Sequence, residues 1–439
     1  MSTSLPAEPV EGARAWQYYL QRKVLVIFFL GFSAGLPFPL VLSTLTAWLQ
    51  DAGLETSTIS KFAWLGFAYS FKFVWSPLVD VLPVPFLTGW LGRRRAWLFL
   101  SQVGIGVSLL VLAGVEPSAA LGAFTAVAIA VALFSATQDI VLDAYRIEVA
   151  GSEMQGVLAA AYQYGYRIAI IVSGAGALYI AQYGSWEMSY RAMAACMVVG
   201  VLTTLFCHEP LVSRAIERKF TGSRAERAFK WFGSSIAGPF TEFFQRFGRW
   251  AIVLLLFITV FRISDYVLGI LANPFYLVIG FSKAEIASVA KLYGLWVSLA
   301  GIGIGGWAIL RYGIPRCVVA ATVLIASTNL FFASLALIGP SLGMLTVTIS
   351  ADNFAMGFAG TVFIAYLSSL TSPLFTATQY ALFSSISSFI GKLIAGFSGN
   401  VQEAVGWFGF FLYAAALGVP AIVLAIIVAR HHHALVQER

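Results

Sequence analysis

Charged residues are scarce in this chain: Asp, Glu, Lys and Arg make up 11% of its 439 residues, whereas 59% are hydrophobic. Soluble domains are typically about a quarter charged, so this composition argues against a soluble protein. Together with a mean hydropathy of +0.84, it predicts a chain embedded in a lipid bilayer. The net charge of +7 does not indicate a nucleic-acid partner, because the basic residues stand between apolar runs and form no stripe.

Cysteine and histidine are also rare. Cys196, Cys207 and Cys317 have no metal-ligand spacing, so we expect inert, reduced thiols and no metal site. His208 and His431–His433 lie at the edges of apolar runs, so an intramembrane proton relay would have to use carboxylates. A membrane acyltransferase would require a His–Asp or Ser–His cluster at one membrane face, and these four histidines are the only ones in the sequence. We therefore expect no enzyme activity, and no cofactor beyond protons as the coupling ion.

Two further motifs are missing. The sequence contains no GxxxxGK[ST] nucleotide-binding loop, which favours a secondary transporter driven by an ion gradient. The polar segment 1–23 has no short apolar region followed by a small-residue cleavage site, so it is not expected to be a removable signal peptide.

Apolar runs of nearly twenty residues recur along the whole chain. They are too long and too uniformly apolar for barrel strands, and backbone groups in lipid must be satisfied within a helix. We therefore predict twelve transmembrane helices, at 24–49, 59–79, 96–115, 119–142, 156–182, 190–207, 250–277, 286–310, 317–338, 343–370, 377–399 and 407–429.

Lysine and arginine are divided unequally between the two sides of these spans. One side holds only Lys61, Arg191 and Lys283. The positive-inside rule then places the other side, with both termini, in the cytoplasm. That side holds Arg14, Arg22, Lys23, Arg93, Arg94, Arg95, Arg146, the linker 208–249, Arg311, Arg316, Arg430 and Arg439.

The linker separates two halves of six spans each. Its basic stretch RAIERKFTGSRAERAFKWF (214–232) is either a tether at the lipid headgroups or a ligand or partner site. The predicted organisation is a cytoplasmic segment, an N-terminal half, the linker, a C-terminal half and a cytoplasmic tail: 1–23, 24–207, 208–249, 250–429 and 430–439.

The two halves resemble each other. Segment 53–70 parallels 280–298, and segment 142–168 parallels 363–387, where an Ala-Tyr pair precedes a short loop and a helix of small residues and aromatics. Two parallel six-helix repeats around a central cavity are the architecture of the major facilitators. We predict this all-helical fold, in a monomer.

The loop after the second span supports the same fold. SPLVDVLPVPFLTGWLGRRR (76–95) resembles the Gly-x-x-x-Asp loop with basic residues of major facilitators, although Ser76 or Pro77 stands where glycine is common. The resemblance implies a cytoplasmic gate made by a carboxylate and arginines. The alternative is that the arginines only set the topology. The predicted gate residues are Asp80, Arg93, Arg94 and Arg95.

Two arginines are expected near the middle of the membrane. Arg167 and Arg262 each lie about twelve residues, or about 18 Å, along their helices from the cytoplasmic face. Ionisable groups in the bilayer are costly and usually functional. Since guanidinium binds carboxylate or phosphate in a bidentate manner, the pair suits an anionic substrate. The alternative is an ion pair of Arg262 with Asp265, three residues on.

Carboxylates are the candidates for proton coupling. Asp139 and Asp143 share a helix face, and their repulsion and burial favour proton uptake by one of them. We expect this to be Asp139, whereas Asp143 is the candidate to be solvated and paired with Arg146. Lys72 either snorkels or reaches Asp139. In the second half, the candidates are Asp265 and Asp352, which are either proton sites or ion-pair partners.

Several stretches together resemble the AmpG-type muropeptide permeases, a major-facilitator family of Gram-negative inner membranes. They are GFSAGLPFPLVLSTLTAWL (31–49), AYSFKFVWSPLVD (68–80) with GRRRAWL (92–98), SATQDIVLDAY (135–145), YGYRIAIIVSGAGAL (164–178) and TATQYALFSSISSFIGKLIAG (376–396).

This resemblance implies proton-driven import of anhydromuropeptides for cell-wall recycling, with an influence on β-lactamase induction and so on antibiotic resistance. It also implies roles for Asp139 and Asp143 in transport. The alternative is a major-facilitator symporter for another organic anion. The predicted substrate contacts, besides Arg167, Arg262 and Lys72, are the aromatic residues Tyr69, Trp75, Tyr162, Tyr166 and Trp296 and the polar residues Gln138 and Asn353.

Overall fold

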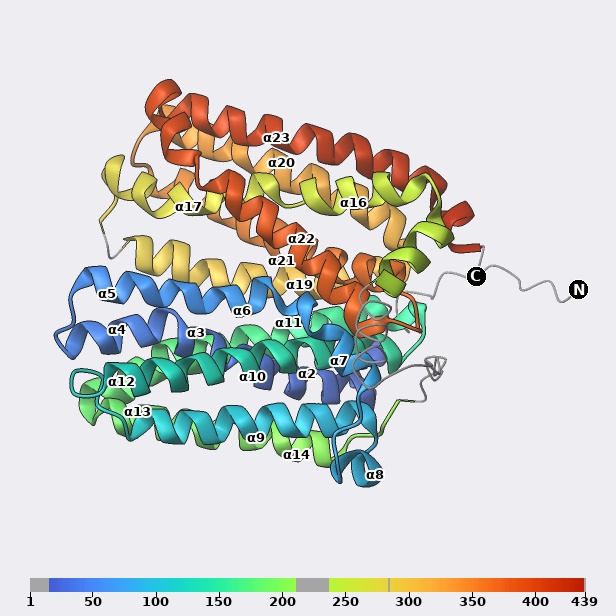
Figure 1. Ribbon diagram of the computed structural model, residues 1–439. Helices are drawn as coiled ribbons and strands as arrows, with labels where there is room; N and C mark the ends of the chain where they lie inside the picture. The colour runs from blue at the N-terminus through green and yellow to red at the C-terminus, as the bar shows by residue number, and fades with distance from the viewer. Residues whose placement is uncertain (1–15, 211–236, 283–284, 438–439) are drawn as a thin grey trace, which may run out of the picture.

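The computed structural model describes residues 16–210, 237–282 and 285–437, and in these residues the chain forms helices and no strand. The basic stretch 214–232, the residues before 16 and Lys283 lie outside the described residues. The helices run side by side along one common direction, with the N-terminal half in blue and green beside the C-terminal half in yellow and red (Figure 1). The predicted all-helical architecture is confirmed.

The first two predicted spans are broken into several pieces. Proline lacks a backbone N–H and crowds the preceding turn, and Pro37 and Pro77 each stand at the start of a new piece. The pieces are α2 (Arg22–Gly35), α3 (Pro37–Val41), α4 (Ser43–Asp51), α5 (Thr56–Lys61), η2 (Phe62–Gly66), α6 (Phe67–Ser70), η3 (Lys72–Val74) and α7 (Ser76–Val81), with η1 (Trp16–Leu20) before them and α8 (Leu87–Leu91) after them.

The rest of the N-terminal half is more continuous. It consists of α9 (Arg93–Ala113), α10 (Leu121–Glu148), η4 (Ser152–Met154), α11 (Gln155–Ile171), η5 (Val172–Gly176), α12 (Ala177–Tyr183), α13 (Trp186–Cys196) and α14 (Val198–Phe206). The end of the bundle at which α2 and α9 begin carries Arg22 and Arg93–Arg95, and we name it the basic end.

The C-terminal half follows residues 237–247, the helical part of the linker. Its long last helix contains a kink at Gly406, whose φ of 69° glycine tolerates best. The helices are α16 (Trp250–Val260), α17 (Ile263–Val278), η6 (Ile286–Tyr293), α19 (Gly294–Tyr312), α20 (Ile314–Ile338), α21 (Leu342–Leu370), α22 (Thr376–Ala395) and α23 (Ser398–Gln437).

Ten stretches among the described residues are helical, long and apolar enough to cross a membrane. The predicted spans 59–79 and 377–399 are the two that do not meet these limits. The first is broken into α5 to α7 and contains Lys72, and the second, α22, is rich in Ser and Thr. Length and apolarity therefore support ten spans directly, and the other two predicted spans are the more polar helices.

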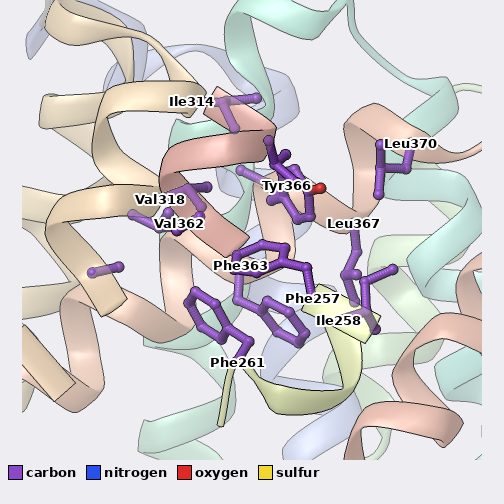
Figure 2. Packing of buried hydrophobic residues seen from close by; sticks show 14 of the residues in the cluster. Phe257, Ile258, Phe261, Ile314, Val318, Val362, Phe363, Tyr366, Leu367 and Leu370 are labelled. Atoms are coloured by element: carbon purple, nitrogen blue, oxygen red, sulfur yellow. The ribbon is translucent and has the colours of Figure 1, made fainter. Parts of the chain in front are cut away.

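Aromatic packing fixes α16 against α21 in the C-terminal half. The rings of Phe261 and Phe363 are stacked with centroids 4.4 Å apart, and Phe257 meets Tyr366 edge to face at 5.3 Å (Figure 2). Each such pair contributes about 0.5–1.5 kcal/mol beyond its buried area. This packing holds the break between α16 and α17, where Arg262 lies.

Helices α2 and α11 approach closely in the N-terminal half. A Cβ atom on Gly165 would overlap the carbonyl oxygen of Phe28, and one on Gly31 would overlap that of Tyr162. Small residues permit such close backbone contact between membrane helices. The contact fixes α11, which carries Tyr162, Tyr166 and Arg167.

The two halves are joined by hydrogen bonds from α11. Gln163 Nε2 donates to Thr361 Oγ1 of α21 at 2.6 Å, and the Tyr164 hydroxyl donates to the Leu299 carbonyl of α19 at 2.8 Å. Helix α11 therefore connects the N-terminal half to α19 and α21 of the other half.

Candidate functional site

Asp143 on α10 is buried between two cations. It is 6% exposed. Its carboxylate lies 3.5 Å from Lys72 Nζ and 3.6 Å from Arg146 Nη2. Lys72 is itself buried, and η3 brings it into an ion pair with Asp143, whereas Asp139, the partner considered from the sequence, lies in its electrostatic range without forming an ion pair. The expected pairing of Asp143 with Arg146 is present, although Asp143 is not solvated.

Asp139 lies one turn away on the same helix and has no such partner. Its Oδ1 atom is buried and has no hydrogen-bond partner among the described residues. It lies within electrostatic range of Lys72 and of Asp143. Of the two aspartates on α10, Asp139 is thus the one whose charge is less compensated. We name Lys72, Asp139, Asp143 and Arg146 the charge cluster.

Arg146 connects the charge cluster to the other half of the protein. It is fully buried, and its Nη1 donates to Ser368 Oγ of α21 at 2.9 Å and to Gln155 at 3.3 Å. Its guanidinium also lies 5.3 Å from the centroid of the Tyr380 ring on α22. The sequence indicated Arg146 only as a partner of Asp143. Its contacts with Ser368 and Tyr380 depend on how two distant helices pack.

Aromatic side chains from three segments form a group near Asp139. Tyr69 donates from its hydroxyl to Ser135 Oγ at 2.9 Å, and Tyr162 and Tyr166 lie 5.7 Å apart by ring centroids. Phe38, which the sequence did not single out, lies 5.4 Å from Tyr69 and 6.5 Å from Tyr166. The three tyrosines are within electrostatic range of Asp139. We name Phe38, Tyr69, Tyr162 and Tyr166 the aromatic group.

Three predicted contacts lie outside this group. Trp75 donates from Nε1 to Thr137 Oγ1 at 3.2 Å on the same helix as Asp139. Gln138 is fully buried and accepts a hydrogen bond from Ser33, so it belongs to the interior of the N-terminal half. Trp296 is 66% exposed on α19 and makes no ring contact with the aromatic group.

The two predicted arginines lie within electrostatic range of each other, across the two halves. They differ in their partners. Arg262 forms an ion pair with Asp265, with Nη2 and Oδ2 2.6 Å apart, as one of the two alternatives predicted. Arg167 is half-buried, its hydrogen bond goes to the Met356 sulfur at 3.6 Å, and it has no ion pair within the described residues. Its positive charge is therefore available to an anion.

Asp352 and Asn353 lie on α21 in the C-terminal half. Asp352 is within electrostatic range of Asp265 and of Tyr276. Asn353 donates from its side-chain amide to the Ile349 carbonyl of its own helix at 3.2 Å. The structure thus groups Asp352 with Asp265 and Arg262, and not with the charge cluster.

Asp80 joins the two halves at the basic end. It accepts hydrogen bonds from the backbone N–H groups of Ala377 and Thr378, at 3.2 and 2.8 Å, and from the Thr378 hydroxyl at 2.7 Å. These N–H groups belong to the first turn of α22, where no intrahelical acceptor exists and negative charge is favoured. Arg94 Nη2 also binds Asp80, at 2.8 Å. We name Asp80, Arg94, Ala377 and Thr378 the latch.

The other predicted gate residues support the latch within the N-terminal half. Arg93 donates to the Asp80 carbonyl, and Arg95 donates to the Thr204 carbonyl at 2.9 Å. Arg94 is held by Glu148, 2.6 Å away, which the sequence analysis did not single out. No group of three metal-binding side chains lies together in the described part of the chain.

Comparison with curated proteins gives long, continuous matches. The chain is 33% identical to a Rickettsia conorii protein named putative transporter AmpG 4, over 414 residues, covering 94% of this chain and 97% of that protein. It is 31% identical to the anhydromuropeptide permease of Escherichia coli K12, over 412 residues, covering 93% and 80% of the two chains. No family model matches the chain.

Solved structures show the same fold. The proton:xylose symporter XylE matches with a TM-score of 0.65 at 13% identity, covering 95% of this chain and 96% of that chain. The transporter FucP, solved in an outward conformation, matches with a TM-score of 0.66 at 15% identity, covering 93% and 99%. These structural matches show the major-facilitator fold. The identities of 33% and 31% to the two curated proteins show the family within that fold. The chain is a multi-pass membrane transporter, not an enzyme, and it belongs to the AmpG-type muropeptide permease family of the major facilitator superfamily.

Proposed function

We propose that this transporter imports anhydromuropeptides, in which N-acetylglucosamine is joined to 1,6-anhydro-N-acetylmuramic acid and a short peptide, together with protons. Transport runs from the periplasm to the cytoplasm across the bacterial inner membrane. The substrate class is supported by the name of the Escherichia coli relative. The arrangement of Arg167, the aromatic group and Asp139 is the observation that carries the proposal.

The substrate has two chemical parts, and each has a counterpart in the protein. Its peptide carries carboxylates, which an arginine binds in a bidentate manner. Arg167 has no ion-pair partner among the described residues, and it follows Tyr166 of the aromatic group directly. Sugar rings suit a set of flat aromatic faces, which the rings of Phe38, Tyr69 and Tyr166 supply. One end of the substrate would bind Arg167 and the other the aromatic group.

Proton coupling follows from the charges in the charge cluster. With both aspartates ionised, Lys72 and Arg146 balance Asp139 and Asp143. A proton on Asp139 leaves a surplus positive charge in a medium where charge is costly. An anionic substrate nearby compensates that charge, so proton uptake and substrate binding favour each other. Such reciprocal coupling is the thermodynamic condition for moving both together.

Protonation of Asp139 and binding of the substrate would affect the opening of the basic end through the charge cluster. Arg146 contacts both Asp143 and the helices α21 and α22 of the other half. A change of charge at Asp139 alters the field at Arg146, and thereby the contact between the two halves. Alternating access requires such a link between site occupancy and the packing of the halves.

Uptake into proteoliposomes tests the proposal. Purified protein is reconstituted, an inward proton gradient is imposed, and accumulation of radiolabelled anhydromuropeptide is measured. We expect accumulation above the protein-free blank, its loss when a protonophore removes the gradient, and its loss in Asp139→Asn, which should still bind substrate. Accumulation no higher than in the blank would rule out the substrate, and accumulation unaffected by the protonophore would rule out the coupling.

Competition distinguishes the alternative, a symporter for another organic anion. Excess unlabelled anhydromuropeptide should abolish uptake of the label, whereas simple dicarboxylates should leave it unchanged. Uptake of a labelled dicarboxylate at a higher rate than that of the muropeptide would favour the alternative.

A further inference from the structure

A pocket of about 270 Å³ lies at the basic end, and no residue of the charge cluster or of the latch lines it. Its walls come from the start of α2, the end of α10 and the residue that follows α14 by two positions. Since water takes up roughly 30 Å³ per molecule in the liquid, the pocket is larger than one ordered water or a bare ion requires. Three span ends meet here, at the level where lipid headgroups lie.

The polar side chains that line the pocket are basic or neutral. Arg22 and His208 are exposed and Lys23 is half-buried, and none of the lining residues is acidic. The carboxylate closest to them in sequence, Glu209, accepts hydrogen bonds from the backbone N–H groups of Arg94 and Arg95, at 2.7 and 3.0 Å. The positive charge at the pocket is therefore not cancelled by a lining residue.

The walls are held in place by hydrogen bonds. Arg22 Nη2 donates to the Phe206 carbonyl at 3.0 Å, and the buried Tyr145 hydroxyl donates to the His208 carbonyl at 2.9 Å. These bonds tie α2 and α10 to the end of α14. The Arg22 guanidinium and the backbone of His208 are thus positioned by the fold.

Apolar surface continues from the pocket along the bundle. Val26 and Val149 line the pocket itself. On α2, Leu25 and Phe29 are 49% and 44% exposed, and on α14, Phe206 is 71% exposed. In a membrane, such exposed apolar stripes face acyl chains. A ligand at this pocket would therefore have its charge at the basic groups and its apolar part along α2 and α14.

We propose that this pocket binds an anionic phospholipid, with the phosphate of its headgroup against Arg22, Lys23 and His208 and its acyl chains along α2 and α14. Basic pockets between membrane helices are known to recognise such headgroups. The linker that follows does not match the charge of this pocket, because its residues 211–236 carry Arg214, Arg218, Lys219, Arg224, Arg227 and Lys230 against Glu217 and Glu226.

Native mass spectrometry of the full-length protein tests the site. The protein is released from nanodiscs of phosphatidylethanolamine mixed with phosphatidylglycerol or cardiolipin, and retained lipids are counted. We expect selective retention of the anionic lipid, with an affinity roughly 30-fold lower in the double variant Arg22→Gln/Lys23→Gln, since each basic group near the membrane contributes about 1 kcal/mol. Equal retention by the wild type and this variant would overturn the proposal.

A matched control removes the same charge elsewhere. Arg311 and Arg316 are exposed residues of the C-terminal half and lie outside the pocket. Arg311→Gln/Arg316→Gln should retain the anionic lipid as the wild type does. An equal loss in both double variants would show only a general effect of net charge and would overturn the assignment to this pocket.

Inorganic phosphate distinguishes a lipid from a soluble phosphate ligand. Added to the same nanodiscs, it should leave the bound lipid in place, because it lacks the acyl chains that pack on α2 and α14. Displacement of the lipid by inorganic phosphate alone would overturn the assignment of the pocket to a lipid.

Discussion

Asp80 of the N-terminal half binds Thr378 of the C-terminal half with both the backbone and the side chain: its Oδ2 lies 2.8 Å from the Thr378 nitrogen and 2.7 Å from the hydroxyl oxygen. Both donors belong to the first turn of α22, so the carboxylate also meets the positive end of a helix dipole. These bonds must break if the two halves separate at the basic end. The latch therefore stabilises the conformation in which that end is closed.

Replacing Asp80 with asparagine should shift the protein toward opening at the basic end. Hydrogen bonds to charged groups contribute about 1.5–3 kcal/mol, so the open population should rise about tenfold or more. Electron-spin distance measurements between labels at Glu153 and Arg316, both exposed at this end, measure the opening. Thr378→Ala, which keeps the backbone N–H, should shift it less. An unchanged distance distribution in Asp80→Asn would exclude the latch.

Asp143 and Asp139 should differ in their effect on stability. Asp143→Asn leaves Lys72 and Arg146 without their carboxylate in a buried setting, where breaking an ion pair costs about 3–5 kcal/mol. Asp139→Asn removes a carboxylate that has no ion-pair partner within 4 Å, so its melting temperature should stay near that of the wild type. Thermal unfolding of the purified variants measures the difference. Equal melting temperatures would contradict the assigned pairing.

Arg167 should contribute directly to binding of the anionic part of the substrate. Losing a charged hydrogen bond of about 1.5–3 kcal/mol predicts that Arg167→Ala binds anhydromuropeptide roughly 10- to 100-fold more weakly, as measured by calorimetry. Arg167→Lys keeps the charge but not the bidentate geometry, so it should lie between the two. If the affinity of Arg167→Ala equals that of the wild type, Arg167 has only a structural role.

Phe38 should affect the sugar part of the substrate and not the peptide part. Its ring contacts Tyr69 and Tyr166, so Phe38→Ala removes one face of the aromatic group. We expect weaker binding of the intact muropeptide and unchanged binding of the peptide freed of its sugars. Phe29→Ala, a change to a ring exposed on the neighbouring helix α2, is the control. Equal losses for both ligands would argue against sugar stacking.

Gly165 should be intolerant of any side chain. Because its Cβ would overlap the Phe28 carbonyl oxygen, Gly165→Ala must separate α2 from α11, and overpacking of this kind typically costs about 1–3 kcal/mol. The melting temperature should fall. Gly174→Ala, where a Cβ meets open space, should be nearly neutral, and equal effects of the two changes would show that the close approach is unimportant.

The outline of the fold was predictable because it depends on local properties of the chain. Apolar runs longer than a bilayer is thick, separated by basic loops, are visible in any stretch of the sequence. The motifs around Asp80 and Asp139 indicated the family in the same way. Even here, the break at Pro77 and the polar residues of the second and eleventh predicted spans made these two of the twelve predicted helices shorter or less apolar than expected.

Pairing of charges in the site was not predictable to the same extent. A helix places residues three or four positions apart together, which is why Arg262 with Asp265 and Asp143 with Arg146 were foreseen. The partner of Lys72 depends on how the broken second span, which contains η3, is rotated against α10. In the observed packing, Lys72 forms its ion pair with Asp143 and not with Asp139.

By itself, then, the sequence determined the membrane location, the family and most of the buried charges, because composition and short-range periodicity carry these properties. Only the tertiary structure decided which of those charges are compensated. It left Asp139 and Arg167 without an ion-pair partner in the described residues, and it brought Phe38, Arg146 and Thr378 to the site from separate helices. The physical reason is that contacts between helices distant in the chain depend on how the helices pack and rotate, which no local pattern encodes.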